Sequence, residues 1–419
     1  MLRVLFRPEL AVVAMAIVVR LVPVLLVPRL HTPLTYEYEW IADRILAGDG
    51  FRFAHLGLDY LSMRPVFVYV CVAVYWLTGH SQVAMLAVQA LVSGATALVV
   101  YTLARQLGGV RAAALAGIAT AIEPALVYYD ITRIHPLGLH TLLLSLVVLV
   151  FVRAAQSPSP RLLLAAGIAV GVAFLERGTP IVFAAVALPL IGYWHRYTAL
   201  QALRAVALVS AGVVVVVSPW AIRNYGVYGT SVLAMTAGPE LFWIGNNPNA
   251  TGTSMTEAGQ TMLAAAPADF RGRVLAADEL TQQRLFSERV RAFVVENPTR
   301  VAALYLEKLG MFWWFGAQEG REHPGWALLV YRPLYGLWLL TAAWGFVVGL
   351  RSGNARSFIL VLAFLAAVSM TQSLAFVEGR HRLSVVPMLL VAGACGLADI
   401  AGRFGHRARA QEPARDPCT

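Results

Sequence analysis

The sequence predicts an all-α membrane protein with about ten transmembrane helices, and two observations carry this prediction. Of its 419 residues, 58% are hydrophobic and only 13% are charged, whereas about 25% of the residues in soluble domains are charged. Apolar runs of about 20 residues, a length that crosses a bilayer as a helix, recur along the chain. This composition excludes an ordinary soluble enzyme, a disordered chain and a nucleic-acid-binding module.

The ten predicted spans are separate apolar runs, at 10–28, 82–104, 111–129, 134–153, 161–176, 179–194, 203–220, 326–350, 357–377 and 383–402. The first is interpreted as a retained span, not a removable signal peptide. Two shorter apolar runs, 65–79 and 299–316, would raise the number to twelve if they crossed the membrane. We favour placing both at the membrane interface as amphipathic helices.

The arginines set the predicted topology. With ten spans, every cytoplasmic loop carries an arginine pair, such as Arg105 with Arg111 or Arg153 with Arg161, as the positive-inside rule requires. Both termini are then cytoplasmic.

We therefore expect one transmembrane domain, 1–402, and a disordered basic tail, 403–419. The acidic residues gather on the outer face, in loops 29–81, 129–135 and 221–325. Amphipathic helices are expected inside these loops, near 36–46 and 277–296.

Carboxylates in the first two outer loops are the candidate catalytic groups. Glu37 and Glu39 flank Tyr38 at the mouth of the first span, where partial burial would raise their proton affinity enough for a general base. The alternative is a solvated helix start, since acids are favoured in the first turn. Asp130 lies in the second loop with His135, and its alternative is an internal ion pair with Arg133.

Several arginines lie at the outer ends of spans, where the positive-inside rule expects few. They indicate an anionic ligand such as a lipid phosphate, although interfacial anchoring and pairing with outer-loop acids are the simpler alternatives. These arginines are Arg64, Arg177, Arg223, Arg380 and Arg382. Arg20, within the first span, is interpreted as an interhelical donor.

The segment 243–252 is rich in Asn and Gly and contains Asn246 and Asn247. Such residues form tight turns, and Asn amides also hydrogen-bond sugar hydroxyls; a plain loop is the alternative. The sequence contains no nucleotide-binding loop and no His/Cys metal spacing. Two nearby carboxylates are compatible with a divalent metal without requiring one.

Together these segments resemble the membrane glycosyltransferases of the GT-C superfamily, and most closely the protein mannosyltransferase and aminoarabinose transferase branch (family 39). The resemblance covers roughly 10–395. Its motifs are Tyr38-x-x-x-Ala42, Arg64-Pro65-x-x-x-Tyr69, Pro219-Trp220-x-x-Arg223-Asn224-Tyr225, Gly245-Asn246-Asn247-Pro248-Asn249-Ala250-Thr251-Gly252 and Arg380-His381-Arg382-Leu383.

The resemblance implies an inverting glycosyltransferase in the bacterial inner membrane, with its active site on the periplasmic side. The donor would be a polyprenyl-phosphate-linked sugar, and the acceptor a hydroxyl of a lipid, glycan or protein. Glu37 or Glu39 would be the base, because Leu34 stands where the family has Asp, and Asp130 would replace a second acid.

The resemblance also implies roles for the remaining polar residues. The lipid phosphate would bind Arg64, Arg380 and Arg382, and the substrates would contact Tyr38, His135, Arg223, Asn246 and Asn247. Three other functions stay open: a transporter or lipid flippase, a ligase or polymerase that uses polyprenyl diphosphate, and a scaffold without activity. A transporter would place charges deep in repeated halves, whereas here the charges cluster at the outer rim.

Overall fold

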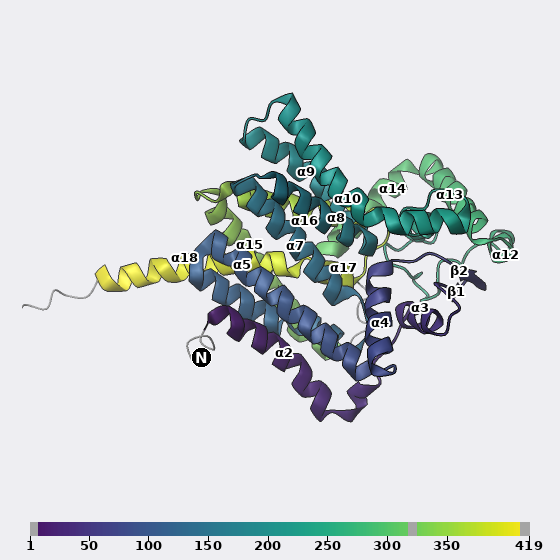
Figure 1. Ribbon diagram of the computed structural model, residues 1–419, viewed down its shortest axis with the longest axis horizontal. Helices are drawn as coiled ribbons and strands as arrows, with labels where there is room; N and C mark the ends of the chain where they lie inside the picture. The colour runs from purple at the N-terminus through teal and green to yellow at the C-terminus, as the bar shows by residue number, and fades with distance from the viewer. Residues whose placement is uncertain (1–6, 317–324, 411–419) are drawn as a thin grey trace, which may run out of the picture.

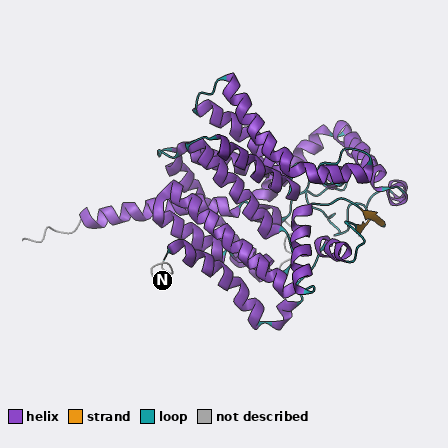
Figure 2. Ribbon diagram, in the orientation of Figure 1, coloured by secondary structure: helices purple, strands orange, loops and turns teal. Residues whose placement is uncertain are grey.

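In the computed structural model, the described residues are 7–316 and 325–410. They form a bundle of long helices, with a smaller group of helices, loops and one hairpin at one end (Figure 1). Figure 2 shows that helices dominate and that the strands are confined to the smaller group. The predicted all-α membrane fold is confirmed.

Among the described residues, seven helices are long and apolar enough to cross a membrane. They are α2 (Pro8–Leu26), α5 (Gln82–Ile122), α7 (Leu137–Gln156), α10 (Ala199–Tyr228), α15 (Gly325–Leu350), α16 (Ala355–Gln372) and α18 (Val386–Ala410). The chain is thus a multi-pass membrane protein. In Figure 1 the described chain begins and ends on the same side of the bundle, opposite the smaller group.

The remaining predicted spans are also helical. The runs 82–104 and 111–129 are joined in α5, which breaks at Gly109 (φ 78°) and is followed by α6 (Pro124–Thr132). Two shorter helices, α8 (Pro160–Glu176) and α9 (Thr179–Trp194), occupy the runs before α10.

The two shorter apolar runs differ from the spans. Helix α4 (Pro65–Thr78) has 14 residues, about 21 Å at 1.5 Å per residue, which is short of the ~30 Å hydrocarbon core. It runs across the outer ends of the long helices in Figure 1. Helix α14 (Pro298–Trp313) lies with the smaller group. The interfacial position of both helices stays a prediction.

Small residues allow the long helices to pack closely, as is common in membranes. A Cβ at Gly167 of α8 would lie 2.1 Å from the carbonyl oxygen of Val209 in α10. A Cβ at Gly345 of α15 would lie 1.8 Å from the carbonyl oxygen of Ala392 in α18. Each glycine therefore marks a contact between two backbones.

The smaller group comes from the first and third outer loops. It contains α3 (Glu37–Leu46), the hairpin of β1 (Phe53–His55) and β2 (Leu58–Tyr60), α11 (Gly238–Ile244), α12 (Ala268–Ala276) and α13 (Glu279–Glu296). Trp243, Phe270 and Phe286 form its aromatic core. Helices α3 and α13 confirm the amphipathic helices predicted near 36–46 and 277–296.

Candidate functional site

Three arginines from separate segments lie within electrostatic range of one another. Arg64 precedes α4, Arg177 follows α8, and Arg380 lies in the short helix α17 (Gly379–Leu383). The charges of Arg64 and Arg380 both act on Arg177. In the part of the chain that the structure describes, neither the Arg64 nor the Arg177 guanidinium has a hydrogen bond or an ion pair. We call these three residues the arginine cluster.

The arginine cluster combines like charges with one buried carboxylate, that of Glu176, whose charge opposes the repulsion at Arg177. Burial, and then the positive charge of Arg64, lower the pKa of Arg177 to about 9. Arg177 is still charged at neutral pH, and the positive charges of Arg64 and Arg380 repel it. A bound anion would reverse the repulsion, so the cluster has the electrostatic character of an anion site.

Two buried histidines adjoin the arginine cluster. His135 accepts the Leu137 N–H on Nδ1 at 3.1 Å, and His381 accepts the Glu378 N–H on Nδ1 at 3.1 Å. Burial lowers the pKa of both rings well below its usual value, and the cluster charges lower it further. Both rings are therefore neutral, and the Nε2–H of each is left as the donor.

The two predicted base candidates separate in the structure. Glu37 begins α3, is half-buried, and makes no side-chain hydrogen bond to any described residue. Its charge and that of Arg64 both act on the hydroxyl of Tyr38, whose pKa is raised, above all by burial. Among the described residues, Glu37 is therefore a half-buried carboxylate without a hydrogen-bond partner.

Glu39 belongs to a different network. Its carboxylate accepts hydrogen bonds from the Tyr75 hydroxyl at 2.9 Å and from Gln82 Nε2 at 2.9 Å, and it lies 3.1 Å from His80 Nε2. Residues two apart on a helix do not face the same side. Glu37 and Glu39 thus point to different partners, and Glu39 ties α3 to the connection between α4 and α5.

Asp130 does not lie in a loop, as predicted, but in the last turns of α6. Its carboxylate accepts from Arg20 Nε at 2.6 Å and from Ser93 Oγ at 2.6 Å. The internal pair with Arg133 does not form, because the Arg133 guanidinium lies over the Tyr129 ring, 4.5 Å from its centroid. Asp130 bridges three helices, and its interhelical donor is Arg20.

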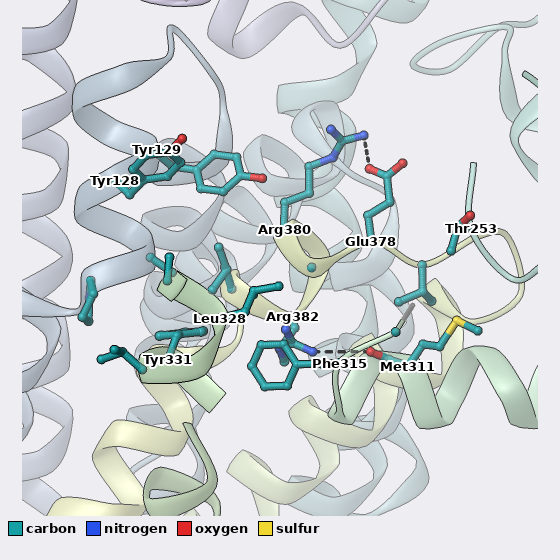
Figure 3. A pocket seen from close by; sticks show the side chains of 18 of the residues that line it. Tyr128, Tyr129, Thr253, Met311, Phe315, Leu328, Tyr331, Glu378, Arg380 and Arg382 are labelled. Carbon is teal, nitrogen blue, oxygen red and sulfur yellow. Dashed lines mark hydrogen bonds and ion pairs between the residues drawn. The ribbon is translucent and has the colours of Figure 1, made fainter. Parts of the chain in front are cut away.

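A cavity of about 480 Å³ adjoins Arg380. Its lining is mostly apolar and includes Leu328 and Tyr331 of α15 and Tyr129 of α6. Figure 3 shows Tyr129 on one side of the cavity, across from Arg380. The lining comes from the segments 326–334 and 377–383, among others, and none of it comes from 65–79.

The two cavity arginines have different surroundings. Arg380 forms an ion pair with Glu378. Arg382 is 2% exposed, and its guanidinium lies 4.2 Å from the centroid of the Phe315 ring and 3.5 Å from the Met311 carbonyl oxygen (Figure 3). Arg380 is therefore the one that joins the arginine cluster, whereas Arg382 is held among aromatic rings.

Arg223, predicted to bind substrate, is used to hold the outer group together. Its guanidinium donates to the carbonyl oxygens of Leu61 and Phe51 and to Asn224 Oδ1 at 2.9 Å. It also lies over the Trp220 ring, 4.8 Å from the centroid. Arg223 thus fastens the first outer loop to the end of α10.

Asn246 and Asn247 are buried, and their amides bond to the backbone. Asn246 Nδ2 donates to the carbonyl oxygens of Phe242 at 2.8 Å and Leu374 at 2.7 Å, and Asn247 Nδ2 donates to that of Trp243 at 3.0 Å. These bonds cap α11. The donors that were expected to meet a sugar are therefore already occupied by carbonyl oxygens.

Sequence reasoning placed Arg177 among the arginines that indicate an anionic ligand but gave it no individual role, and it gave the imidazole of His381 none. Arg177 did stand out as an arginine on the outer side, against the positive-inside rule, but nothing local linked it to Arg64. Within 7–316 and 325–410, no three His, Cys, Asp or Glu side chains are grouped to hold a metal ion.

Comparisons with known proteins agree with this fold. Residues 63–222 match the family of dolichyl-phosphate-mannose-protein mannosyltransferases. The crystal structure of ArnT from Cupriavidus metallidurans bound to undecaprenyl phosphate aligns with a TM-score of 0.56 and 17% identity, over 96% of this chain and 62% of that chain. No curated protein sequence matches this chain significantly.

A second similar structure is the apo oligosaccharyltransferase from Archaeoglobus fulgidus, with a TM-score of 0.56 and 13% identity, over 98% of this chain and 53% of that one. The same enzyme in a complex with Zn and sulfate aligns with a TM-score of 0.55 and 13% identity, over 96% of this chain and 50% of that one. This chain thus spans between half and two thirds of the length of these proteins. Its fold is that of the GT-C membrane glycosyltransferases, as its motifs indicated, and its residues 63–222 match the mannosyltransferase family.

Proposed function

We propose that this protein is a membrane glycosyltransferase that moves a sugar from a polyprenyl-phosphate donor to a hydroxyl acceptor. One observation carries the proposal: the arginine cluster, two of whose guanidiniums have no partner among the described residues, adjoins a largely apolar cavity. A polyprenyl phosphate has the matching chemistry, an anionic head on an apolar chain. The similarity to ArnT, which was crystallised with undecaprenyl phosphate, points to the same ligand class.

In the proposed reaction, Glu37 accepts the proton of the acceptor hydroxyl while the hydroxyl oxygen attacks the anomeric carbon from the face opposite the phosphate. The bond between the anomeric carbon and the phosphate oxygen breaks, and polyprenyl phosphate leaves with the bonding electron pair. The sugar is thereby transferred with inversion. A positioned general base contributes about 10²–10⁴-fold to such a step.

The arginine cluster stabilises the negative charge that develops on the leaving phosphate. Charge stabilisation of this kind is commonly the largest catalytic contribution, and removal of one strong donor costs about 10²–10³-fold in kcat. The neutral rings of His135 and His381 add Nε2–H donors without adding positive charge. The tyrosines and aliphatic side chains of the cavity would hold the first isoprene units. Burial of these units would contribute about 25 cal/mol to the binding free energy for each Å² of apolar surface removed from water.

The proposed location follows from the distribution of arginines. The loops opposite the candidate site carry arginine pairs, which the positive-inside rule assigns to the cytoplasm. The arginine cluster would then face the periplasm, where the acceptor could be a lipid, glycan or protein. Reporter fusions that place Tyr38 in the cytoplasm would contradict this orientation.

The test is sugar transfer by purified protein in lipid nanodiscs, with polyprenyl-monophosphate and polyprenyl-diphosphate sugars compared as donors. Arg177→Gln removes charge-assisted hydrogen bonds worth about 1.5–3 kcal/mol, so we expect the donor KM to rise about 10- to 100-fold. Glu37→Gln should lower kcat about 10²–10⁴-fold. The exposed Arg284, which pairs only loosely with Glu288 at 4.0 Å, provides the control Arg284→Gln, which should behave as wild type.

Two outcomes would overturn the proposal. Full activity of both Glu37→Gln and Glu39→Gln would remove the base. Transfer from diphosphate donors alone would favour a ligase or polymerase instead.

A further inference from the structure

Lys308 is the only lysine in the sequence, and its side chain is completely buried. It lies in α14, outside the long helices. Four oxygen atoms lie within hydrogen-bond distance of its ammonium, whose three N–H groups they share. They are the carbonyl oxygens of Gly245 at 3.1 Å, Leu374 at 3.3 Å and Ala375 at 2.9 Å, and Asn246 Oδ1 at 3.0 Å.

This cation is held by dipoles and not by a carboxylate. Burial lowers the pKa of Lys308 to about 8, and the charge of Glu307 opposes that effect, so the ammonium is mostly protonated at pH 7. A buried charge is costly unless hydrogen bonds compensate for it. An apolar side chain would pack at this position without that cost, so the arrangement calls for a role other than packing.

The four oxygens belong to two segments that are far apart in the sequence. On one side is the turn at Gly245 and Asn246, and on the other is the turn after α16, at Leu374 and Ala375. The backbones touch here, because a Cβ at Gly245 would lie 1.8 Å from the Ala375 carbonyl oxygen. Asn246 Nδ2 also donates to the Leu374 carbonyl oxygen at 2.7 Å. Lys308 therefore closes a junction between the third outer loop and the residues that follow α16.

The junction leads directly into the arginine cluster. Two residues beyond Ala375, the Val377 N–H donates to the Gly252 carbonyl oxygen at 2.9 Å. The next residue, Glu378, accepts a hydrogen bond from Ser254 and forms the ion pair with Arg380. The segment 374–380 is thus fastened to the outer loop at successive points, and Lys308 provides the first of them.

We propose that Lys308 is a positioning residue for donor binding: its ammonium fixes the start of segment 374–380 and so sets where Arg380 meets the donor phosphate. This inference rests on the proposed function and extends it. It also gives the Gly245-Asn246 motif a physical purpose, which is to supply two of the four oxygens and to allow the close approach of the two backbones.

The test substitutes Lys308→Met, which keeps the aliphatic stem and removes the ammonium. Arg284→Met is the control, because it removes an exposed positive charge that pairs only loosely with Glu288, at 4.0 Å. Hydrogen–deuterium exchange of amides 376–383 measures how firmly this segment is held in place. The affinity for undecaprenyl phosphate and the donor KM measure how that affects donor binding. Small displacements of binding groups cost up to about 10²-fold.

We expect amides 376–383 of Lys308→Met to exchange at least about tenfold faster than in wild type. The donor KM and the dissociation constant for undecaprenyl phosphate should rise about 10- to 100-fold, with kcat changed less than about threefold. Arg284→Met should match wild type in all three measurements. If Lys308→Met does not fold, Asn246→Leu removes one oxygen and one tether and should show the same changes with smaller amplitude.

Unchanged exchange in segment 376–383 would overturn the inference. Faster exchange with unchanged undecaprenyl phosphate affinity, or a fall in kcat at constant KM, would overturn it as well. If wild-type protein transfers no sugar from any donor, the proposed function fails; the exchange rates and the undecaprenyl phosphate affinity still decide whether Lys308 positions an anion site.

Discussion

Arg20→Met removes the guanidinium that pairs with the buried carboxylate of Asp130. We expect this to be the most damaging single change in the bundle. Arg20 and Asp130 are 2% and 4% exposed, and Arg20 Nε lies 2.6 Å from the carboxylate. Arg20 Nη1 also donates to the Ala121 carbonyl oxygen at 2.8 Å. In the variant, Ser93 remains as the hydrogen-bond donor to Asp130.

Breaking a buried ion pair costs about 3–5 kcal/mol, because one charge is left without compensation. Arg20→Met should therefore lose about that much stability in reversible unfolding from mixed micelles. Asp130→Asn should lose less, about 1.5–3 kcal/mol, since Arg20 keeps its bond to Ala121. In the double variant no uncompensated charge remains, so its loss should be smaller than the sum of the two single losses.

Additive losses, or a loss below about 1 kcal/mol for Arg20→Met, would refute the reasoning about this ion pair. The same proteins test the catalytic prediction for Asp130. If Asp130→Asn abolished sugar transfer while its unfolding free energy stayed that of wild type, Asp130 would be a catalytic group and not an interhelical bridge.

Three further outcomes are expected. Glu39→Gln should lower the free energy of unfolding by about 1–3 kcal/mol, because charge-assisted bonds from Tyr75 and Gln82 weaken. Its kcat should stay within about threefold of wild type. A large fall in kcat at unchanged stability would make Glu39 the base. Stability should fall as the pH drops below about 6.5, by about 1.4 kcal/mol per pH unit for each of His135 and His381. The sign follows because burial lowers their folded pKa, so the unfolded chain binds protons first; a flat profile from pH 7 to 5 would contradict it. Gly345→Ala should prevent close packing of α15 on α18, since its Cβ would lie 1.8 Å from the Ala392 carbonyl oxygen, and monodisperse protein at wild-type yield would argue against that contact.

Properties that depend on neighbouring residues alone could be predicted from the sequence. A run of apolar residues long enough to span a bilayer is a local property, and every predicted span is helical in the structure. The same holds for α3 and α13, whose apolar side chains recur at helical spacing. Asn297–Pro298 ends α13 as expected, because the residue before proline disfavours helical geometry.

The fine structure of the candidate site depended on residues far apart in the chain. Glu37 and Glu39 are equivalent in sequence, but only the fold brings Tyr75 and Gln82 to Glu39 and leaves Glu37 without a hydrogen bond to any described residue. Asp130 finds its partner 110 residues away.

What the sequence determined by itself is therefore the membrane class and the helical runs, because hydropathy and helical periodicity act over short stretches of chain. Only the tertiary structure decided which arginines lie near one another, which partners Glu39 and Asp130 have, and which oxygens surround the single lysine. The physical reason is that a charge is controlled by whatever lies within a few ångströms of it, and here those neighbours come from different helices.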